Sequence, residues 1–125
     1  MTGGGSGIGA AVLPAPCMDG AMTIVADLDE QAAARVAREL PQGCVARSLD
    51  VSDAASVAAL IEDVVQQYGS LEIAVNNAGI GGLQPALHET PFEAWQKILS
   101  VNLDGVFHCM QHELRVMARA EKAPS

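Results

Sequence analysis

Short apolar runs alternate with amphipathic stretches along most of the chain, and this alternation restricts the possible folds strongly. The apolar runs cover residues 21–26, 44–49 and 71–75. Between them, residues 29–40 and 53–68 place small and aliphatic side chains on one helical face. Strands that alternate with helices of this length form βαβ units around a parallel sheet, with right-handed crossovers. We therefore predict an α/β fold.

The first nine residues contain five glycines and lead into a predicted helix. Glycine reaches positive φ and lets another molecule approach the backbone closely. The free N–H groups of the first helical turn would then form an anion site suited to a phosphate. A flexible glycine-rich terminus is the alternative interpretation. Pro14 and Pro16 predict that the helix after this loop is about two turns long or distorted.

Asp27 ends the first apolar run, 18 residues beyond Gly9. At that distance in a βαβ unit, an acidic side chain accepts hydrogen bonds from the ribose hydroxyls of an adenine dinucleotide. A 2′-phosphate would meet a like charge, and neither Leu28 nor Ser6 offers a positive one, so the pattern favours NAD over NADP. The alternative is that Asp27 caps the next helix, a role that Asp29 could take instead.

Polar or glycine residues also follow the other two apolar runs. Asp50-Val51 follows the second run, and Asn76-Asn77-Ala78-Gly79 follows the third. The carboxyl ends of parallel strands meet at one edge of the sheet, where ligands bind. We expect both groups to lie at that edge together with Asp27 and the glycine loop.

Capping patterns predict further helix boundaries. Ser52 is expected to cap the helix over residues 53–68, and Gly69 to end it. A capping box with Thr90 as N-cap, Pro91 at the first helical position and Glu93 at the third starts a last helix.

That last helix is expected to continue through Met117, with Asn102 in its interior. Asparagine is a poor interior helix residue, so Asn102 indicates a local bend or a functional role, with a surface position as the alternative. His108 and His112 have a metal-compatible spacing, but no further ligand is placed to complete a site, which favours a polar helix face.

Charge and composition exclude several classes of partner. Lys and Arg total 7 against 15 Asp and Glu, a net charge of −8, which disfavours nucleic acid and anionic membranes. No apolar run approaches the ~20 residues of a membrane span, and no signal peptide is visible. We expect a cytoplasmic protein in which Cys17, Cys44 and Cys109 are reduced thiols.

In order and spacing, these features resemble the short-chain dehydrogenase/reductase family. The resemblance covers nearly the whole chain apart from residues 14–19. It rests on the following segments: Thr2-Gly3-x-x-x-Gly7-x-Gly9, Asp27, Asp50-Val51, Asn76-Asn77-Ala78-Gly79 and Val101-Asn102-Leu103-x-Gly105-Val106-Phe107.

The resemblance implies a Rossmann-type, doubly wound parallel sheet and a role for each matching residue. Gly3, Gly7 and Gly9 would shape the turn, with Ser6 and Ile8 near the pyrophosphate. Asp27 and Leu28 would lie at the adenosine ribose, and Asp50 and Val51 beside the adenine. Asn77, Ala78 and Gly79 would line the floor beneath the cofactor. Asn102 would be the asparagine of the catalytic tetrad.

The chain also departs from the family pattern. The family needs a serine and a Tyr-x-x-x-Lys motif after the asparagine helix, and the only tyrosine here, Tyr68, is followed by Gly69-Ser70-Leu71-Glu72. The family also begins with a central strand before the threonine of the glycine loop, and only Met1 precedes Thr2. The resemblance therefore implies that residues 1–125 are a partial NAD(P)-binding Rossmann domain that lacks the first strand and the C-terminal half.

Two functions remain open at this point. In the first, the parent protein transfers hydride between NAD(H) and a secondary alcohol or ketone, and this chain, inactive alone, supplies the dinucleotide half. In the second, the chain is a non-catalytic NAD-binding or subunit-interaction fragment, and the helix around Asn102 would pair it into a homo-oligomer.

Overall fold

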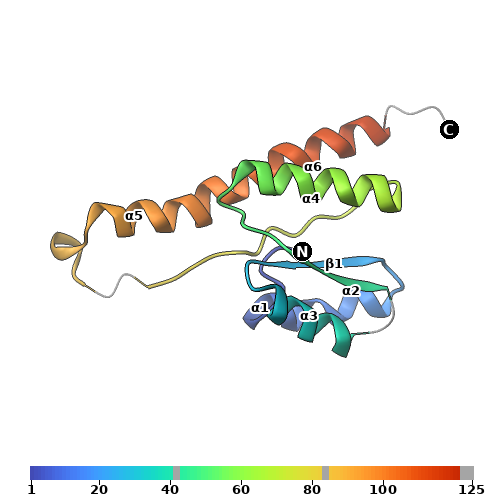
Figure 1. Ribbon diagram of the computed structural model, residues 1–125, viewed down its shortest axis with the longest axis horizontal. Helices are drawn as coiled ribbons and strands as arrows, with labels where there is room; N and C mark the ends of the chain where they lie inside the picture. Colours follow the sequence, from blue (N-terminus) through green and yellow to red (C-terminus); the bar gives the residue numbers. More distant parts are fainter. Residues whose placement is uncertain (41–42, 83–84, 122–125) are drawn as a thin grey trace.

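The computed structural model describes residues 1–40, 43–82 and 85–121. Figure 1 shows a small sheet with helices on both sides and a long helical arm. In chain order the elements are α1 (Gly7–Val12), α2 (Pro14–Met18), β1 (Thr23–Asp27), α3 (Glu30–Glu39), β2 (Cys44–Ser48), α4 (Ala54–Tyr68), η1 (Leu87–Glu89), α5 (Phe92–Leu99), η2 (Ser100–Asp104) and α6 (Gly105–Glu121).

The sheet is parallel, as the sequence predicts. β1 and β2 pair in register from Thr23 opposite Cys44 to Asp27 opposite Ser48. On the other side of β1, Thr2 forms isolated parallel bridges to both Ala26 and Asn76. Met1 and Thr2 therefore lie between β1 and the segment that ends at residue 76. They occupy the sheet position that the family resemblance assigns to a central strand.

The predicted strand over residues 71–75 is wrong as a regular strand. Its only pairing in the described structure is the bridge at Asn76, supported by a 3.0 Å hydrogen bond from the N–H of Thr2 to the carbonyl of Val75. A strand is stabilised by hydrogen bonds to a neighbour along its length. Met1 and Thr2 are too short to supply them to all five residues.

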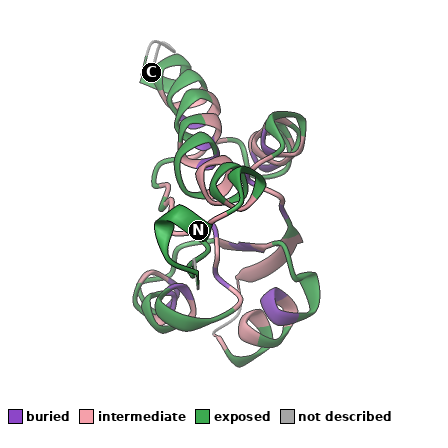
Figure 2. Cartoon of the chain, turned by 90° about the vertical axis from the view of Figure 1, so that its left-hand side faces the viewer, coloured by how far each residue is buried: buried purple, intermediate pink, exposed green. Residues whose placement is uncertain are grey.

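Helices cover both faces of the sheet, which confirms the doubly wound arrangement (Figure 1). Successive β1 residues point to opposite faces. Val25 belongs to a buried cluster with Leu13 and Ala33, on the side of α1 and α3. Ala26 belongs to a second cluster with Cys109, among others, on the side of α4 and α6. Figure 2 shows the buried residues in these central elements, whereas much of α6 is exposed.

Several predicted helix ends are confirmed and others need correction. Gly69 ends α4 in the left-handed conformation with φ 90°. Asp53, not Ser52, caps α4, because its carboxylate accepts from the N–H of Ala55. The predicted capping box at Thr90 is wrong. The Thr90 hydroxyl donates a hydrogen bond to the carbonyl of Ala86 at 3.1 Å, and Pro91 is the N-cap of α5.

The two prolines divide the first helix as predicted. α1 ends at Val12, and the separate α2 begins at Pro14. Pro14 and Pro16 both lie in the first turn of α2, where backbone N–H groups have no partner within the helix. The prolines therefore cost α2 few hydrogen bonds.

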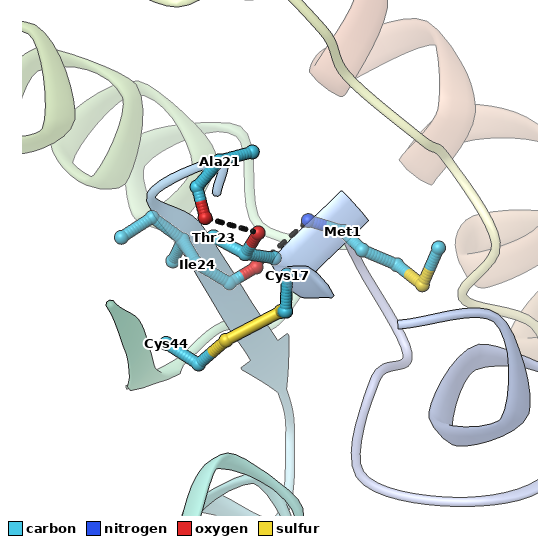
Figure 3. The surroundings of a disulfide bond; sticks show 6 residues. All are labelled: Met1, Cys17, Ala21, Thr23, Ile24 and Cys44. Carbon is cyan, nitrogen blue, oxygen red and sulfur yellow. Dashed lines mark hydrogen bonds between the residues drawn. A yellow bond between two sulfur atoms is a disulfide. The ribbon is translucent and has the colours of Figure 1, made fainter. Parts of the chain in front are cut away.

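The expectation of reduced thiols is wrong for Cys17 and Cys44, which form a disulfide (Figure 3). α2 brings Cys17 beside the first residue of β2, with the two Cα atoms 6.8 Å apart. Cys109 is free and buried. Burial, reinforced by the Glu113 carboxylate, raises the pKa of the Cys109 thiol to about 11. Among the described helices, none is both long and apolar enough to cross a membrane.

Candidate functional site

A pocket of about 590 Å³ lies at the carboxyl edge of the sheet. Most of the predicted site residues line it, although they come from distant parts of the chain. The predicted residues in its wall are Gly3, Ser6, Gly7, Ile8, Asp27, Leu28, Asp50, Val51, Asn77, Ala78 and Gly79. Gly9 and Asn102 do not line the pocket. Each of them contacts a segment that does line it.

The glycine loop needs its glycines at particular positions. Gly3 and Gly7 have φ of 63° and 53°, which residues with a side chain rarely adopt. Gly9 is buried, and a Cβ there would overlap the carbonyl oxygen of Gly3 and lie 2.7 Å from Nδ2 of Asn77. At Gly7 a Cβ would meet no atom within 4 Å. The loop is therefore packed tightly on its inner side, whereas on the pocket side its backbone is not covered by other atoms.

Asp27 is held in place by two backbone N–H groups. Gly5 donates to Oδ2 at 2.9 Å, and Asp29 donates to Oδ1 at 3.0 Å. Each oxygen keeps further lone-pair capacity for a ligand. Asp29, not Asp27, is the N-cap of α3, since its carboxylate accepts from the N–H of Ala32 at 3.0 Å. The alternative role for Asp27 is thereby excluded.

Ser52 forms hydrogen bonds to Asp50 instead of capping α4. Its hydroxyl and its N–H both donate to Oδ1 of Asp50, at 2.6 and 2.9 Å. These bonds lower the pKa of the Asp50 carboxyl from its usual value, so the group is ionised at neutral pH. Val51 is buried against Gly105, where a Cβ would come within 2.7 Å of its side chain. The close approach fixes residues 50–51 against the start of α6.

Thr2 and Asn77 tie the glycine loop to the segment after residue 75. Oγ1 of Thr2 accepts from the N–H groups of Asn77 and Ala78, at 3.1 and 3.0 Å. In return, Nδ2 of Asn77 donates to the carbonyls of Thr2 and Gly3, at 3.2 and 3.1 Å. Two segments about 75 residues apart are thus locked together beneath the pocket.

Asn102 lies in η2, a short π-helical segment between α5 and α6. Regular α-helical geometry is therefore interrupted at Asn102, and the residue is exposed, as the alternative interpretation expects. Its Oδ1 accepts from the N–H of Ile80, and its Nδ2 donates to the carbonyl of the same residue, both at 2.8 Å. Asn102 thus holds the segment that follows Gly79 against the helix.

Six lining residues were not predicted as site residues: Thr2, Asp29, Leu49, Ile80, Lys97 and Val101. Thr2 belongs to the glycine-loop motif, and that position was the available indication of its role. Among the described residues of this wall, Lys97 is the one basic side chain. It comes from α5, and no local pattern in the sequence marks it as a pocket residue.

His108 and His112 acquire no metal-site partners in the described part of the chain. In the described ranges no group of three or more His, Cys, Asp or Glu side chains could hold a metal ion.

Three features define a dinucleotide-binding Rossmann-type protein: a glycine loop that leads into a helix, an anchored carboxylate at the end of β1 and a pocket at the carboxyl edge of the sheet. A family model described as short chain dehydrogenase matches residues 1–124. The chain belongs to the short-chain dehydrogenase family.

Two curated relatives and one solved structure illustrate the similarity. Cis-4-hydroxycyclohexanecarboxylate dehydrogenase of Sinomonas cyclohexanicum is 38% identical over 122 residues, which are 96% of this chain and 49% of that protein. 2-(S)-Hydroxypropyl-CoM dehydrogenase 3 of Xanthobacter autotrophicus is 39% identical over 125 residues, 98% of this chain and 49% of that protein.

The structure is that of 3-ketoacyl-(acyl-carrier-protein) reductase from Brucella melitensis complexed with NADH. It matches with a TM-score of 0.89 and 31% identity, over 94% of this chain and 48% of that one. The chain spans about half the length of the relatives it matches.

Proposed function

We propose that the chain is the NAD-binding half of an oxidoreductase that transfers hydride between NAD(H) and a small secondary alcohol or ketone. The observation that carries this proposal is the Asp27 carboxylate, fixed by two N–H groups at the rim of a glycine-lined pocket. The Brucella reductase holds NADH, and two relatives are dehydrogenases named for hydroxylated small molecules.

The residues present fit a nicotinamide dinucleotide. The bare backbone at Gly7 leaves room for a pyrophosphate, and Ser6, the N-cap of α1, makes no side-chain capping bond that would block the first-turn N–H groups. The cofactor would supply the hydride chemistry, and these residues would bind and orient it. Among the described lining residues, three carboxylates (Asp27, Asp29 and Asp50) share the wall with one cation, Lys97, which disfavours a 2′-phosphate and supports NAD over NADP.

Replacing Asp27 with asparagine tests this preference. Asp27→Asn removes the charge and weakens the ribose hydrogen bonds, so we expect NADH to bind about 10- to 100-fold more weakly, while NADPH binding falls less or rises. Asp29→Asn, which removes one negative charge from the same wall and keeps a capping oxygen, is the matched control. Dissociation constants for both cofactors would be measured by calorimetric titration. An unchanged NADH to NADPH ratio in Asp27→Asn would refute the ribose assignment.

We expect no hydride transfer from residues 1–125 by themselves. Proton transfer to the alcohol oxygen requires a group placed at the reacting carbon, and the only tyrosine, Tyr68, ends α4 and has Glu72 four residues later. In this proposal Asn102 positions residue 80 beside the pocket and belongs to a catalytic set that the remainder of the protein completes. A cytoplasmic location stays a prediction.

The second candidate function, subunit interaction, is favoured by one surface. Four large apolar side chains, each about half exposed or more, follow one another at helical spacing along η2 and α6: Leu103, Phe107, Met110 and Leu114. We name this the α6 stripe. The opposite face of α6 packs on α4 through Cys109. A stripe of this kind is typical of helix pairing, so we propose that two copies associate through it.

We expect the chain to form a dimer or larger assembly, and Phe107→Glu to shift it to monomer, because a charge in the middle of the stripe would be desolvated on pairing. Sedimentation velocity of both forms measures the change. Gln66→Glu adds the same charge to the exposed side of α4 and should leave the assembly intact. Association that survives in Phe107→Glu would contradict pairing through the stripe.

A further inference from the structure

The segment that joins α1 to β1 is anchored to the rest of the chain at one side chain. Within residues 14–22, all of which the structure describes, only Cys17 is buried, with 3% of its surface exposed. The five residues after it, 18–22, are all exposed. Leu13, at the end of α1, belongs to the buried cluster with Val25. The buried anchor of α1 is therefore a different residue from that of α2.

The hydrogen bonds of this segment are local. The N–H groups of Gly20 and Ala21 donate to the carbonyls of Cys17 and Pro16, both at 3.1 Å. Among the described residues, no hydrogen bond joins residues 14–22 to β2 or α3. The direct link between α2 and β2 in this part of the structure is therefore the disulfide from Cys17, which Figure 3 shows.

α2 is too short to be stable without such a link. It has five residues, and isolated helices well above this length are already marginal in water. The disulfide joins positions 27 residues apart. A cross-link over such a span stabilises the folded arrangement mainly because it restricts the open chain. The position of α2 against the sheet therefore depends on the bond between Cys17 and Cys44.

The disulfide lies at the end of the sheet away from the dinucleotide pocket. Cys44 is the first residue of β2 and pairs with Thr23, the first residue of β1. The pocket lies beside Asp27, the last residue of β1. Strands rise roughly 3.3 Å per residue, so the two ends are roughly 13 Å apart. Chemistry at the disulfide would therefore act on α2 without contacting the residues that line the pocket.

The three cysteines differ in how easily a small thiol reaches them. Cys44 is partly exposed, whereas Cys17 and Cys109 are 3% and 2% exposed. Burial raises the pKa of the Cys109 thiol to about 11, which keeps it out of the reactive thiolate form. Exchange begins when a thiolate attacks a disulfide sulfur that it can reach, and exposed disulfides are the labile ones. A thiol from solvent therefore meets Sγ of Cys44 first.

We propose that Cys17 and Cys44 form a reversible thiol–disulfide site that reacts with a small-molecule thiol of the glutathione class through Cys44, and that opening it releases α2 from the sheet. Residues 14–22 are ordered in the oxidised form and detached in the reduced form. The site is independent of the cofactor and gives the chain a response to the thiol redox state around it.

The exchange takes place in two steps. The thiolate of the small molecule attacks Sγ of Cys44, the bond between the two protein sulfurs breaks, and Cys17 leaves as a thiolate that takes a proton. A second small thiolate attacks the small-molecule sulfur of the mixed disulfide, which releases Cys44 and forms the small-molecule disulfide. Two small thiols are oxidised and the protein disulfide is reduced. The reverse reaction with the small-molecule disulfide closes the bond again.

Hydrogen exchange of the oxidised and the dithiothreitol-reduced full chain tests the release of α2. We expect exchange at the amides of Gly20 and Ala21 to accelerate on reduction by at least about tenfold more than at Val57 in α4. The double variant Cys17→Ser/Cys44→Ser should exchange rapidly at both amides with and without reductant. Cys109→Ser, the matched control, keeps the disulfide and should respond like the unaltered chain. An equal change at all three amides would overturn the proposal.

Trapping the first intermediate tests the entry point. The oxidised chain is treated briefly with reduced glutathione and quenched with acid, and peptide mass spectrometry locates the attached glutathione. We expect at least about tenfold more glutathione on Cys44 than on Cys17, and none on Cys109. Equal labelling of Cys17 and Cys44, or an oxidised chain without a peptide that links them, would overturn the proposal. Neither measurement uses NADH, so the result is separate from that of the proposed function.

Discussion

Replacing Gly9 with alanine is expected to abolish measurable NADH binding and to destabilise the chain by about 3 kcal/mol. A Cβ at Gly9 would overlap the carbonyl oxygen of Gly3, which is backbone and cannot rotate away. It would also press on Nδ2 of Asn77, whose bond to Gly3 holds the loop on the floor of the pocket. Calorimetric titration with NADH and urea unfolding would measure the two effects.

Gly81→Ala is the matched control for this substitution. Gly81 is exposed, and a Cβ there would meet nothing within 4 Å. It should therefore bind NADH like the unaltered chain and unfold at nearly the same urea concentration. If Gly9→Ala bound NADH as tightly as Gly81→Ala, the tight inner packing of the loop could not be what shapes the site.

Thr2→Val should cost about 3 kcal/mol of stability and weaken NADH binding. Valine keeps the shape of threonine but has no oxygen, so the N–H groups of Asn77 and Ala78 lose their acceptor at a position that is 8% exposed. Each buried N–H group left unpaired costs about 1–3 kcal/mol. The free energy of unfolding in urea measures the loss.

Thr2→Ser separates the hydroxyl from the methyl group. Serine keeps the acceptor and loses only one methyl, so its cost should stay near about 1 kcal/mol. If Thr2→Ser were as destabilising as Thr2→Val, packing would account for the role of Thr2, and the paired N–H groups would contribute little.

The positions of residues that depend on local geometry were predicted well from the sequence. The positions of the loop glycines were predicted from the backbone conformation that the loop needs. The position of Asp27 at the pocket was predicted from its place at the end of an apolar run. The break at Pro14 and the interruption of α-helical geometry at Asn102 follow from local propensity. Each of these features needs only the residue and a few neighbours, because strand direction already fixes which ends share an edge of the sheet.

Features that depend on partners far along the chain were predicted poorly. Residues 71–75 have the composition of a strand, but a strand needs a neighbour, and Met1 and Thr2 pair only with its end. Ser52 and Thr90 satisfy helix-cap patterns, yet their hydroxyls donate to Asp50 and to the carbonyl of Ala86. The Cys17–Cys44 disulfide depends on how α2 packs beside β2, which spacing along the chain does not reveal.

The most direct test of the central claim is a calorimetric titration of the unaltered chain with NADH and, in parallel, with NADPH. We expect a single saturable site per chain for NADH, with NADPH at least about tenfold weaker because of the Asp27 carboxylate. Absence of NADH binding by a chain that circular dichroism shows to be folded, or tighter binding of NADPH, would contradict it.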